Sequence, residues 1–296
     1  MTVSHTRALI GCGVAASLWI LLGSAVSVLE PRQAAPPQAG SSLPRFHHVH
    51  LNAVNPAASI QFYSTHFKSE KATFAGMDAI RTPNGWLLFN KTADAPINGT
   101  DAGLWHIGWG SSDTKSQYDR LLAMGTRFGP NLTEIKSAVD PRQRYFVYAH
   151  GPADESIEIF AESGGDEFEH IHLRAADIVA AEQWYVIHLG ATNAPPVGGP
   201  ATQPTGVVPP AWIDHVAFRF QRTPGRATFE SSRGRVFDHV AFSVDNLEQT
   251  LARFQKEGVR VVEAPHTILG GALRSAFIEA PDSVQIELVE DRATRQ

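Results

Sequence analysis

The sequence predicts an α+β fold made of four copies of one strand–helix–strand–strand–strand module, paired into two halves. The first observation is a repeated motif: residues 46–53 and 168–175 are closely alike, and residues 104–109 and 237–242 form a looser pair. Apolar and polar side chains alternate in all four, which is typical of strands. Irregular connections between the copies argue against a solenoid, so we expect curved sheets.

A helix with a recognisable start is expected after each of these strands. Asn55 precedes a proline at the first helical position, and Asp113 and Asp177 can cap the second and third helices. Asp245, with Glu248 three residues later, resembles a capping box for the fourth. Glycines expected after the helices are Gly125, Gly190 and Gly258.

Short strands complete each module, and the last strands of the second and fourth modules are similar. Residues 152–158 and 281–287 both run from a proline to a glutamate. We therefore divide the globular part into residues 45–163, with modules one and two, and residues 164–291, with modules three and four. Residues 292–296 form a tail.

The N-terminus predicts export from the cytoplasm. Residues 8–29 carry no charge and follow Arg7. As a helix this run would be long enough to cross a bilayer, and it also resembles a signal peptide. We expect residues 1–29 to be a cleaved signal or a membrane anchor and 30–44 to be a flexible Pro/Ala/Gln linker. Either alternative makes the globular part secreted, periplasmic or tethered outside the cytoplasm.

Composition excludes several classes of function. The net charge is −5, whereas nucleic-acid binding needs a basic surface. One cysteine excludes a disulfide framework and a cysteine-based metal site. The chain has 13 histidines, and their positions carry most of the functional information.

Alternation places histidines on one face of each repeated strand. Val49 and Leu51 share one face of the first, and His48, His50 and Asn52 share the other. The same alternation sets aside the polar face for the remaining first-strand histidines and for the final-strand glutamates, namely His106, His170, His172, His239, Glu158 and Glu287. Because the apolar face packs on the helices, this polar face would line a cavity.

Two histidines and one carboxylate on a cavity wall predict a divalent metal site for Fe, Mn, Zn, Ni or Co. Within the predicted halves, the second offers His170, His239 and Glu287. The first offers His48, His106 and Glu158. The alternative is that these are ordinary polar residues on strand surfaces. We expect about one metal ion per chain, in the second half.

From Arg45 to Glu290 the chain resembles the vicinal oxygen chelate superfamily of glyoxalases, bleomycin resistance proteins and extradiol dioxygenases. The resemblance implies βαβββ modules paired into two open, cup-shaped barrels, with a metal bound by residues of the first and last strands. It also implies a small oxygen-rich substrate that chelates the ion through two neighbouring oxygens. The final strand of module one, residues 86–90, has no carboxylate.

The family's ring-cleaving members also place a histidine and a tyrosine before the final glutamate. His266 is the candidate histidine, but Phe277 stands at the tyrosine position of the second half. Tyr148 stands at the matching position of the first half. His266 and Tyr148 are thus the candidate catalytic residues.

Candidate substrate-binding residues lie on the ligand face. His50 and His172 follow a predicted ligand by two positions, and Arg174 could hold a carboxylate. The leading hypothesis is an exported divalent-metal enzyme with isomerase, lyase or dioxygenase chemistry. The alternatives are a non-catalytic protein that sequesters a small molecule and a scaffold whose sites have decayed.

Overall fold

The structure, a computed structural model, describes residues 43–99, 101–136, 143–161, 165–194 and 208–290. All of them belong to one compact unit of the chain, Pro36–Gln296. Segment 8–29, most of linker 30–44 and tail 292–296 lie outside the described residues, so the signal or anchor and the export stay predictions. Among the described residues, no helix has both the length and the apolar character needed to cross a membrane.

Module one follows the predicted order of elements, and module two has one short strand more than predicted. The first consists of β1 (Arg45–Ala53), α1 (Pro56–His66), β2 (Glu70–Phe74), β3 (Met77–Thr82) and β4 (Gly85–Lys91). The second consists of β5 (Leu104–Ser111), α2 (Thr114–Ala123), β6 (Arg127–Phe128), β7 (Thr133–Ile135), β8 (Arg144–His150) and β9 (Ser156–Ala161).

Modules three and four repeat the pattern. The described part of the third consists of β10 (Phe168–Ala175), α3 (Ile178–Leu189), β11 (Ala211–Ile213) and β12 (Val216–Arg222). The fourth consists of β13 (Phe237–Ser243), α4 (Leu247–Lys256), β14 (Arg260–Ile268), β15 (Leu273–Glu279) and β16 (Gln285–Glu290), with short 3-10 turns at Leu269–Gly271 and Pro281–Ser283. The predicted α+β class is confirmed.

The helices begin where capping side chains satisfy free backbone N–H groups. The side chains of Asn55, Asp113 and Asp177 accept such hydrogen bonds at the starts of α1, α2 and α3, as predicted. The cap of α4 is Asn246 and not Asp245, so that prediction was wrong by one residue. The glycines expected after helices have the left-handed backbone that favours glycine, with φ of 82° at Gly125, 72° at Gly190 and 82° at Gly258.

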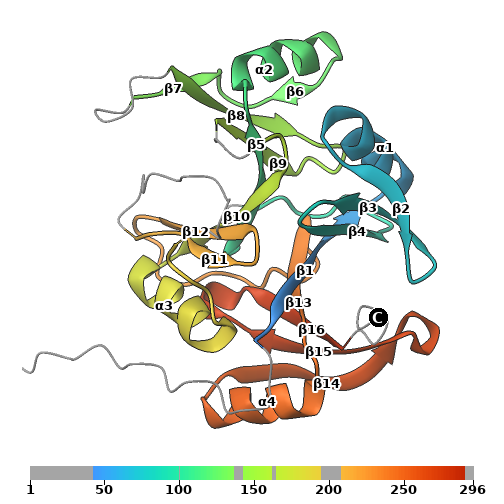
Figure 1. Ribbon diagram of the computed structural model, residues 1–296, viewed down its shortest axis with the longest axis vertical. Coiled ribbons are helices and arrows are strands. Elements are labelled where there is room, and N and C mark those ends of the chain that lie inside the picture. The colour runs from blue at the N-terminus through green and yellow to red at the C-terminus, as the bar shows by residue number, and fades with distance from the viewer. Residues whose placement is uncertain (1–42, 100, 137–142, 162–164, 195–207, 291–296) are drawn as a thin grey trace, which may run out of the picture. The chain divides into compact units, whose positions relative to one another are not determined.

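The modules pair differently from the prediction. One eight-stranded sheet has the order β14-β15-β16-β13-β1-β4-β3-β2, and it combines modules one and four. The other runs β11-β12-β10-β5-β9-β8-β6, with β7 beside β8, and combines modules two and three. We call them the β1–β13 sheet and the β5–β10 sheet after the antiparallel first strands at their centres (Figure 1). The predicted pairing of neighbouring modules was wrong.

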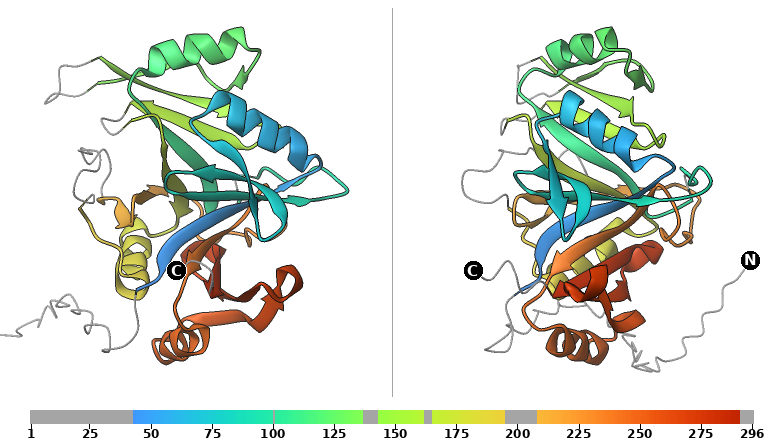
Figure 2. Two further views of the ribbon diagram at one scale, coloured as in Figure 1. Left: turned by 45° about the vertical axis from the view of Figure 1, so that its right-hand side comes forward. Right: turned by 90° about the vertical axis from the view of Figure 1, so that its right-hand side faces the viewer.

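A shared aromatic core joins the two sheets. The ring of Phe46 on β1 lies 5.8 Å from that of Phe168 on β10 and 6.4 Å from that of Phe218 on β12. The Phe218 ring also lies 5.7 Å from the Phe242 ring on β13. Helices α1 to α4 lie along the outer sides of the sheets (Figures 1 and 2). All four modules therefore contribute to one hydrophobic core.

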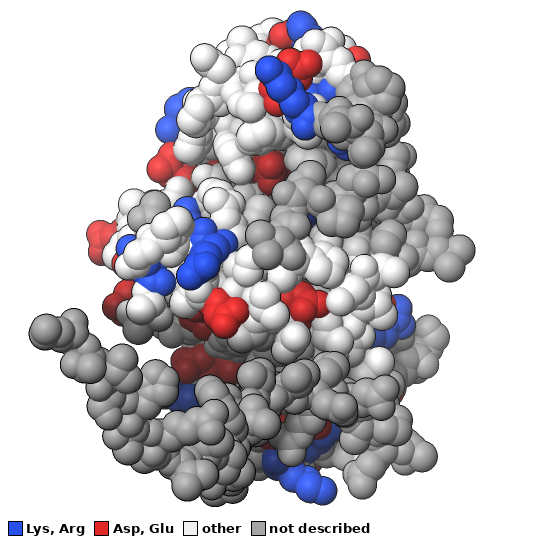
Figure 3. Space-filling model, turned by 90° about the vertical axis from the view of Figure 1, so that its left-hand side faces the viewer, with Lys and Arg blue, Asp and Glu red and all other residues white. Residues whose placement is uncertain are grey.

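The charged surface is mixed. On the face drawn in Figure 3, the acidic and basic side chains of the described residues lie in small, separate groups. This distribution matches a chain whose net charge is −5. On this face the described residues form no broad basic surface of the kind that binds a phosphate backbone.

We predict that Phe218→Ala lowers the free energy of unfolding by about 3–5 kcal/mol, because it removes a fully buried ring and leaves a cavity. The matched control is Leu122→Ala on α2, where the side chain is 50% exposed; its effect should stay below about 0.5 kcal/mol. Chemical denaturation followed by tryptophan fluorescence measures both. Equal effects of the two substitutions would contradict the shared core.

Candidate metal centres

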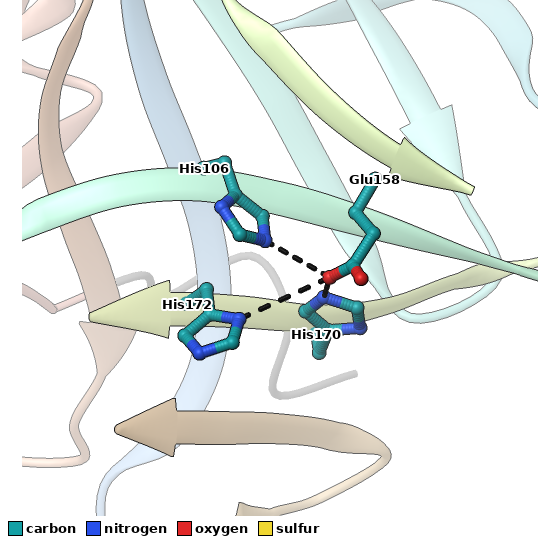
Figure 4. A group of neighbouring side chains, drawn as sticks. All are labelled: His106, Glu158, His170 and His172. Carbon is teal, nitrogen blue, oxygen red and sulfur yellow. Dashed lines mark hydrogen bonds and ion pairs between the residues drawn. The ribbon is translucent and has the colours of Figure 1, made fainter. Parts of the chain in front are cut away.

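Three histidines and one glutamate of the β5–β10 sheet converge in what we call the Glu158 cluster (Figure 4). His106 comes from β5, Glu158 from β9, and His170 and His172 from β10. The Nε2 atoms of His106 and His170 each lie 3.0 Å from Oε2 of Glu158, and Nδ1 of His172 lies 3.9 Å from it. One ligand atom from each of the four residues lies within 4.8 Å of the others.

A second set, the Glu287 cluster, occupies the corresponding place in the β1–β13 sheet. His48 and His50 come from β1, His239 from β13 and Glu287 from β16. The Nε2 atoms of His48 and His239 each lie 3.3 Å from Oε2 of Glu287. Ligand atoms of the three histidines lie within 4.8 Å of one another.

The grouping of the predicted ligands was wrong, although each of them lies in one of the two clusters. His170 contacts Glu158 and not His239 or Glu287. His48 contacts Glu287, whereas His106 contacts Glu158. The reason is the sheet pairing, because each cluster forms where the first strands of two paired modules run side by side. Whether these residues hold a metal stays a proposal.

Each pair of first strands contains two β-bulges, and every bulge inserts the residue that precedes a histidine. The inserted residues are His47, Trp105, Glu169 and Asp238. A bulge interrupts strand alternation and redirects a side chain. Oε2 of Glu169 therefore lies 2.5 Å from Nδ1 of His170, and Oδ1 of Asp238 lies 2.7 Å from Nδ1 of His239. Strict alternation, on which our prediction rested, places these carboxylates on the opposite face.

The charges within the Glu158 cluster are strongly coupled. Burial alone would lower the pKa of His170, but the carboxylates of Glu169 and Glu158 outweigh it and raise the pKa to about 9. Burial opposes ionisation of Glu158, yet hydrogen bonds from the imidazoles hold its pKa well below the usual range. Burial lowers the pKa of His106 to about 3. Before a metal binds, the cluster therefore holds an ionised carboxylate and one protonated imidazole.

Arg219 and Gly108 fix the position of His170. Nη2 of Arg219 lies 3.0 Å from Oε1 of Glu169, whose other oxygen accepts from His170. A Cβ at position 108 would lie 2.0 Å from the His170 ring, so only glycine leaves room for it. Ala241 occupies the same register position opposite His48. The two clusters therefore differ in how closely a ligand ring approaches the neighbouring strand.

The Glu287 cluster has its own supporting residues. Asp238 accepts hydrogen bonds from the backbone N–H of Gly234 and from Nδ2 of Asn52, at 2.7 and 3.0 Å. Ser275 donates to Oε1 of Glu287. Burial would lower the pKa of His239, but hydrogen bonds to Asp238 and Glu287 raise it. This arrangement orients the imidazole as outer partners of metal ligands commonly do.

The strand register shows which residue stands where a second, symmetry-related carboxylate of each cluster would be. Glu158 lies opposite Gly108, two residues after His106. His172, two residues after His170, lies opposite Arg219 on β12. His50, two residues after His48, lies opposite Leu88 on β4. Neither cluster therefore has a second final-strand carboxylate, as the sequence of residues 86–90 predicts for module one.

The other candidate residues lie in different surroundings. The Tyr148 ring lies 5.1 Å from the His106 ring, and the guanidinium carbon of Arg174 lies 4.4 Å from the centre of the Trp105 ring. The Trp105 ring in turn contacts His106. Tyr148 and Arg174 are therefore at the edge of the Glu158 cluster.

His266 lies on β14, far along the sheet order from β1. Its Nδ1 bonds the carbonyl oxygen of Ala264 at 3.1 Å, and its Nε2 lies 3.5 Å from a carboxylate oxygen of Glu263. Neither Ala264 nor Glu263 is a cluster residue, although the cross-strand partner of His266 on β15 is Ser275, which donates to Glu287. Its proposed catalytic role stays a prediction.

Five supporting residues were not predicted from the sequence. They are Gly108, Glu169, Arg219, Asp238 and Ser275. The dipeptides Glu169–His170 and Asp238–His239 were a usable signal, since an acid often orients a ligand histidine. Arg219, Gly108 and Ser275 gave no such signal, because their roles depend on neighbouring strands.

Parts of the chain are similar in sequence to known proteins. Residues 167–288 match the sequence model of the Glyoxalase/Bleomycin resistance protein/Dioxygenase superfamily. Lactoylglutathione lyase of Salmonella typhimurium is 37% identical over 57 residues, which cover 19% of this chain and 42% of that protein. Lactoylglutathione lyase of Haemophilus influenzae is 31% identical over 62 residues, which cover 21% of this chain and 46% of that protein. The chain thus matches less than half the length of these curated relatives.

Solved structures share the fold over most of the chain. Glyoxalase I from Zea mays superimposes with a TM-score of 0.64 at 14% identity, covering 84% of this chain and 93% of that one. A putative dioxygenase from Bacillus subtilis gives a TM-score of 0.58 at 13% identity, with 85% and 86% covered. Residues 167–288 thus match the sequence model of that superfamily, and the described part of the chain has the fold of these solved structures.

Proposed function

We propose that this chain is a divalent-metal enzyme that acts on a small, oxygen-rich substrate at the Glu158 cluster. The observation that carries the proposal is the convergence of three imidazoles on one buried carboxylate. The buried Nδ1 of His172, which faces Oε2 of Glu158, has no hydrogen-bond partner in the structure. Unpartnered buried polar atoms are costly, and a bound ion would satisfy those that face it. The donor types suit Fe, Mn, Zn, Ni or Co.

The chain supplies the rest of the site through its own side chains. When bound, the ion would act as a Lewis acid on two neighbouring substrate oxygens. Burial raises the pKa of Tyr148 far above neutrality, so its hydroxyl stays protonated and can donate a hydrogen bond to a developing oxyanion. Half-buried Arg174 has a buried Nη1 without a hydrogen-bond partner, and this atom can hold a substrate anion.

Lyase or isomerase chemistry is favoured over ring cleavage. The curated relatives carry the name lactoylglutathione lyase, and the histidine proposed for ring cleavage, His266, forms its hydrogen bond and its ion pair with Ala264 and Glu263, outside the clusters. The substrate class we favour is therefore an α-oxoaldehyde or its thiol adduct. The second candidate function is sequestration of a small molecule without turnover.

An activity screen of the metal-reconstituted protein separates these functions. We expect turnover of the adduct of methylglyoxal with a thiol, followed by ultraviolet absorbance, and no oxygen uptake with catechol. His170→Ala should lower the rate at least ~100-fold, since it removes a proposed ligand. Oxygen uptake with catechol would favour the dioxygenase alternative. Ligand binding by chelator-treated protein, without turnover of either compound, would favour sequestration.

Metal content provides an independent prediction. We expect His170→Ala and His106→Ala each to lose the ion of the Glu158 cluster, because a lost imidazole leaves too few donors. His215→Ala is the matched control, since His215 is exposed in the turn between β11 and β12. Elemental analysis after dialysis measures all three proteins. Wild-type metal content in both cluster variants would rule out this site.

Metal binding should depend on pH. In the metal-free cluster the pKa of His170 is about 9, so at neutral pH the ion must displace a proton. The apparent affinity should therefore rise roughly 10-fold per pH unit between about pH 7 and pH 9 and then level off. In Glu169→Gln the rise should shift to lower pH, because a carboxylate that raises the pKa is gone. Competition with a metal indicator dye tests this, and an affinity independent of pH would count against it.

A further inference from the structure

The Glu158 cluster lacks a ligand that its own symmetry would supply. Each final strand can present a carboxylate opposite the position two residues after a first-strand histidine, as Glu158 does opposite Gly108. At the corresponding place on β12 stands Arg219, opposite His172. An arginine side chain has no lone pair for a metal and carries a positive charge, so β12 cannot contribute a donor here.

Arg219 is also engaged elsewhere. Its Nη2 lies 3.0 Å from Oε1 of Glu169, and its guanidinium carbon lies 5.4 Å from the centre of the Phe160 ring. The carboxylate of Glu169 is in turn hydrogen-bonded to His170. The residue that replaces the carboxylate therefore orients a ligand from outside the cluster.

His172 lies on the side of the cluster where β12 contributes no carboxylate. It follows His170 by two residues on β10 and is the direct cross-strand partner of His106. Its Nδ1 is buried, has no hydrogen-bond partner and points toward Oε2 of Glu158 (Figure 4). The Nε2 atoms of His106 and His170 point to the same oxygen, so three imidazole nitrogens face one point.

The Glu287 cluster has the same arrangement. In this cluster Leu88 on β4 stands opposite His50, where a second carboxylate would be. His50 is the cross-strand partner of His239, and its Nε2 is buried without a hydrogen-bond partner. In both clusters, the first strand whose parallel neighbour has no carboxylate at this position thus carries a second histidine, two residues after the first.

We propose that His172 is the fourth metal ligand of the Glu158 cluster, bound through Nδ1, and that the donor set is three imidazoles and one carboxylate. This inference rests on the proposed function, since it assumes that the cluster holds a divalent ion. Three neutral donors and one carboxylate leave a divalent ion with one net positive charge. A bound ion with one net positive charge attracts anionic oxygen ligands more strongly than an ion whose charge is neutralised by two carboxylates.

The test is the affinity of purified full-length protein for Zn²⁺, measured by competition with a chelator. His172→Phe keeps a planar ring but removes the donor, and it should weaken binding at the Glu158 cluster at least ~100-fold, beyond the usual effect of outer residues. His172→Gln offers an amide oxygen and should recover part of this loss. His215→Phe is the matched control and should bind as the wild type does. Binding at the Glu158 cluster is identified as the phase that His170→Ala removes.

A spectroscopic measurement supports the assignment without depending on activity. With Cu²⁺ at the Glu158 cluster, pulsed electron paramagnetic resonance should detect one fewer coordinated imidazole in His172→Phe than in the wild type. Unchanged Zn²⁺ affinity and an unchanged imidazole signal would overturn the proposal and leave His172 as a substrate contact. If His170→Ala removes no binding phase, it is the proposed metal site itself that fails.

Discussion

Both candidate centres depend on the antiparallel pairing of two first strands, interrupted by a bulge at each end. The pairing sets His106 directly opposite His172, and His50 directly opposite His239. The bulges then place an acidic residue beside one histidine of each pair of strands, Glu169 beside His170 and Asp238 beside His239. A regular ladder would keep the histidines together but would direct these acids to the other face of the sheet.

The two clusters share this architecture but differ in the side chains that surround them. Beside the Glu158 cluster lie the half-buried side chains of Trp105, Tyr148 and Arg174. At the corresponding positions of the Glu287 cluster, Asp238, Phe277 and Asn52 are buried. Asn52 and Asp238 bond to each other there. The Glu158 cluster is thus the one with polar side chains left open to a substrate, which is why we assign catalysis to it.

Much of the architecture was predictable because it depends on local sequence patterns. The strand alternation, the capping residues Asn55, Asp113 and Asp177, and the glycines after the helices all act within a few residues. Their physical effect does not depend on the rest of the chain. The same holds for the six predicted ligand residues, because alternation alone placed them on the polar faces of their strands. Asp245 shows the limit of local patterns, since Asn246 competes for the same cap.

The sequence by itself determined four modules, their elements and a set of histidines and glutamates with the chemistry of metal ligands. Only the tertiary structure decided which modules pair, and therefore that His170 meets Glu158 and not Glu287. Four first strands with similar patterns can pair in several ways with similar local energy. The choice among them depends on long-range packing, such as that of Phe46 against Phe168 and Phe218, which no short window of sequence contains.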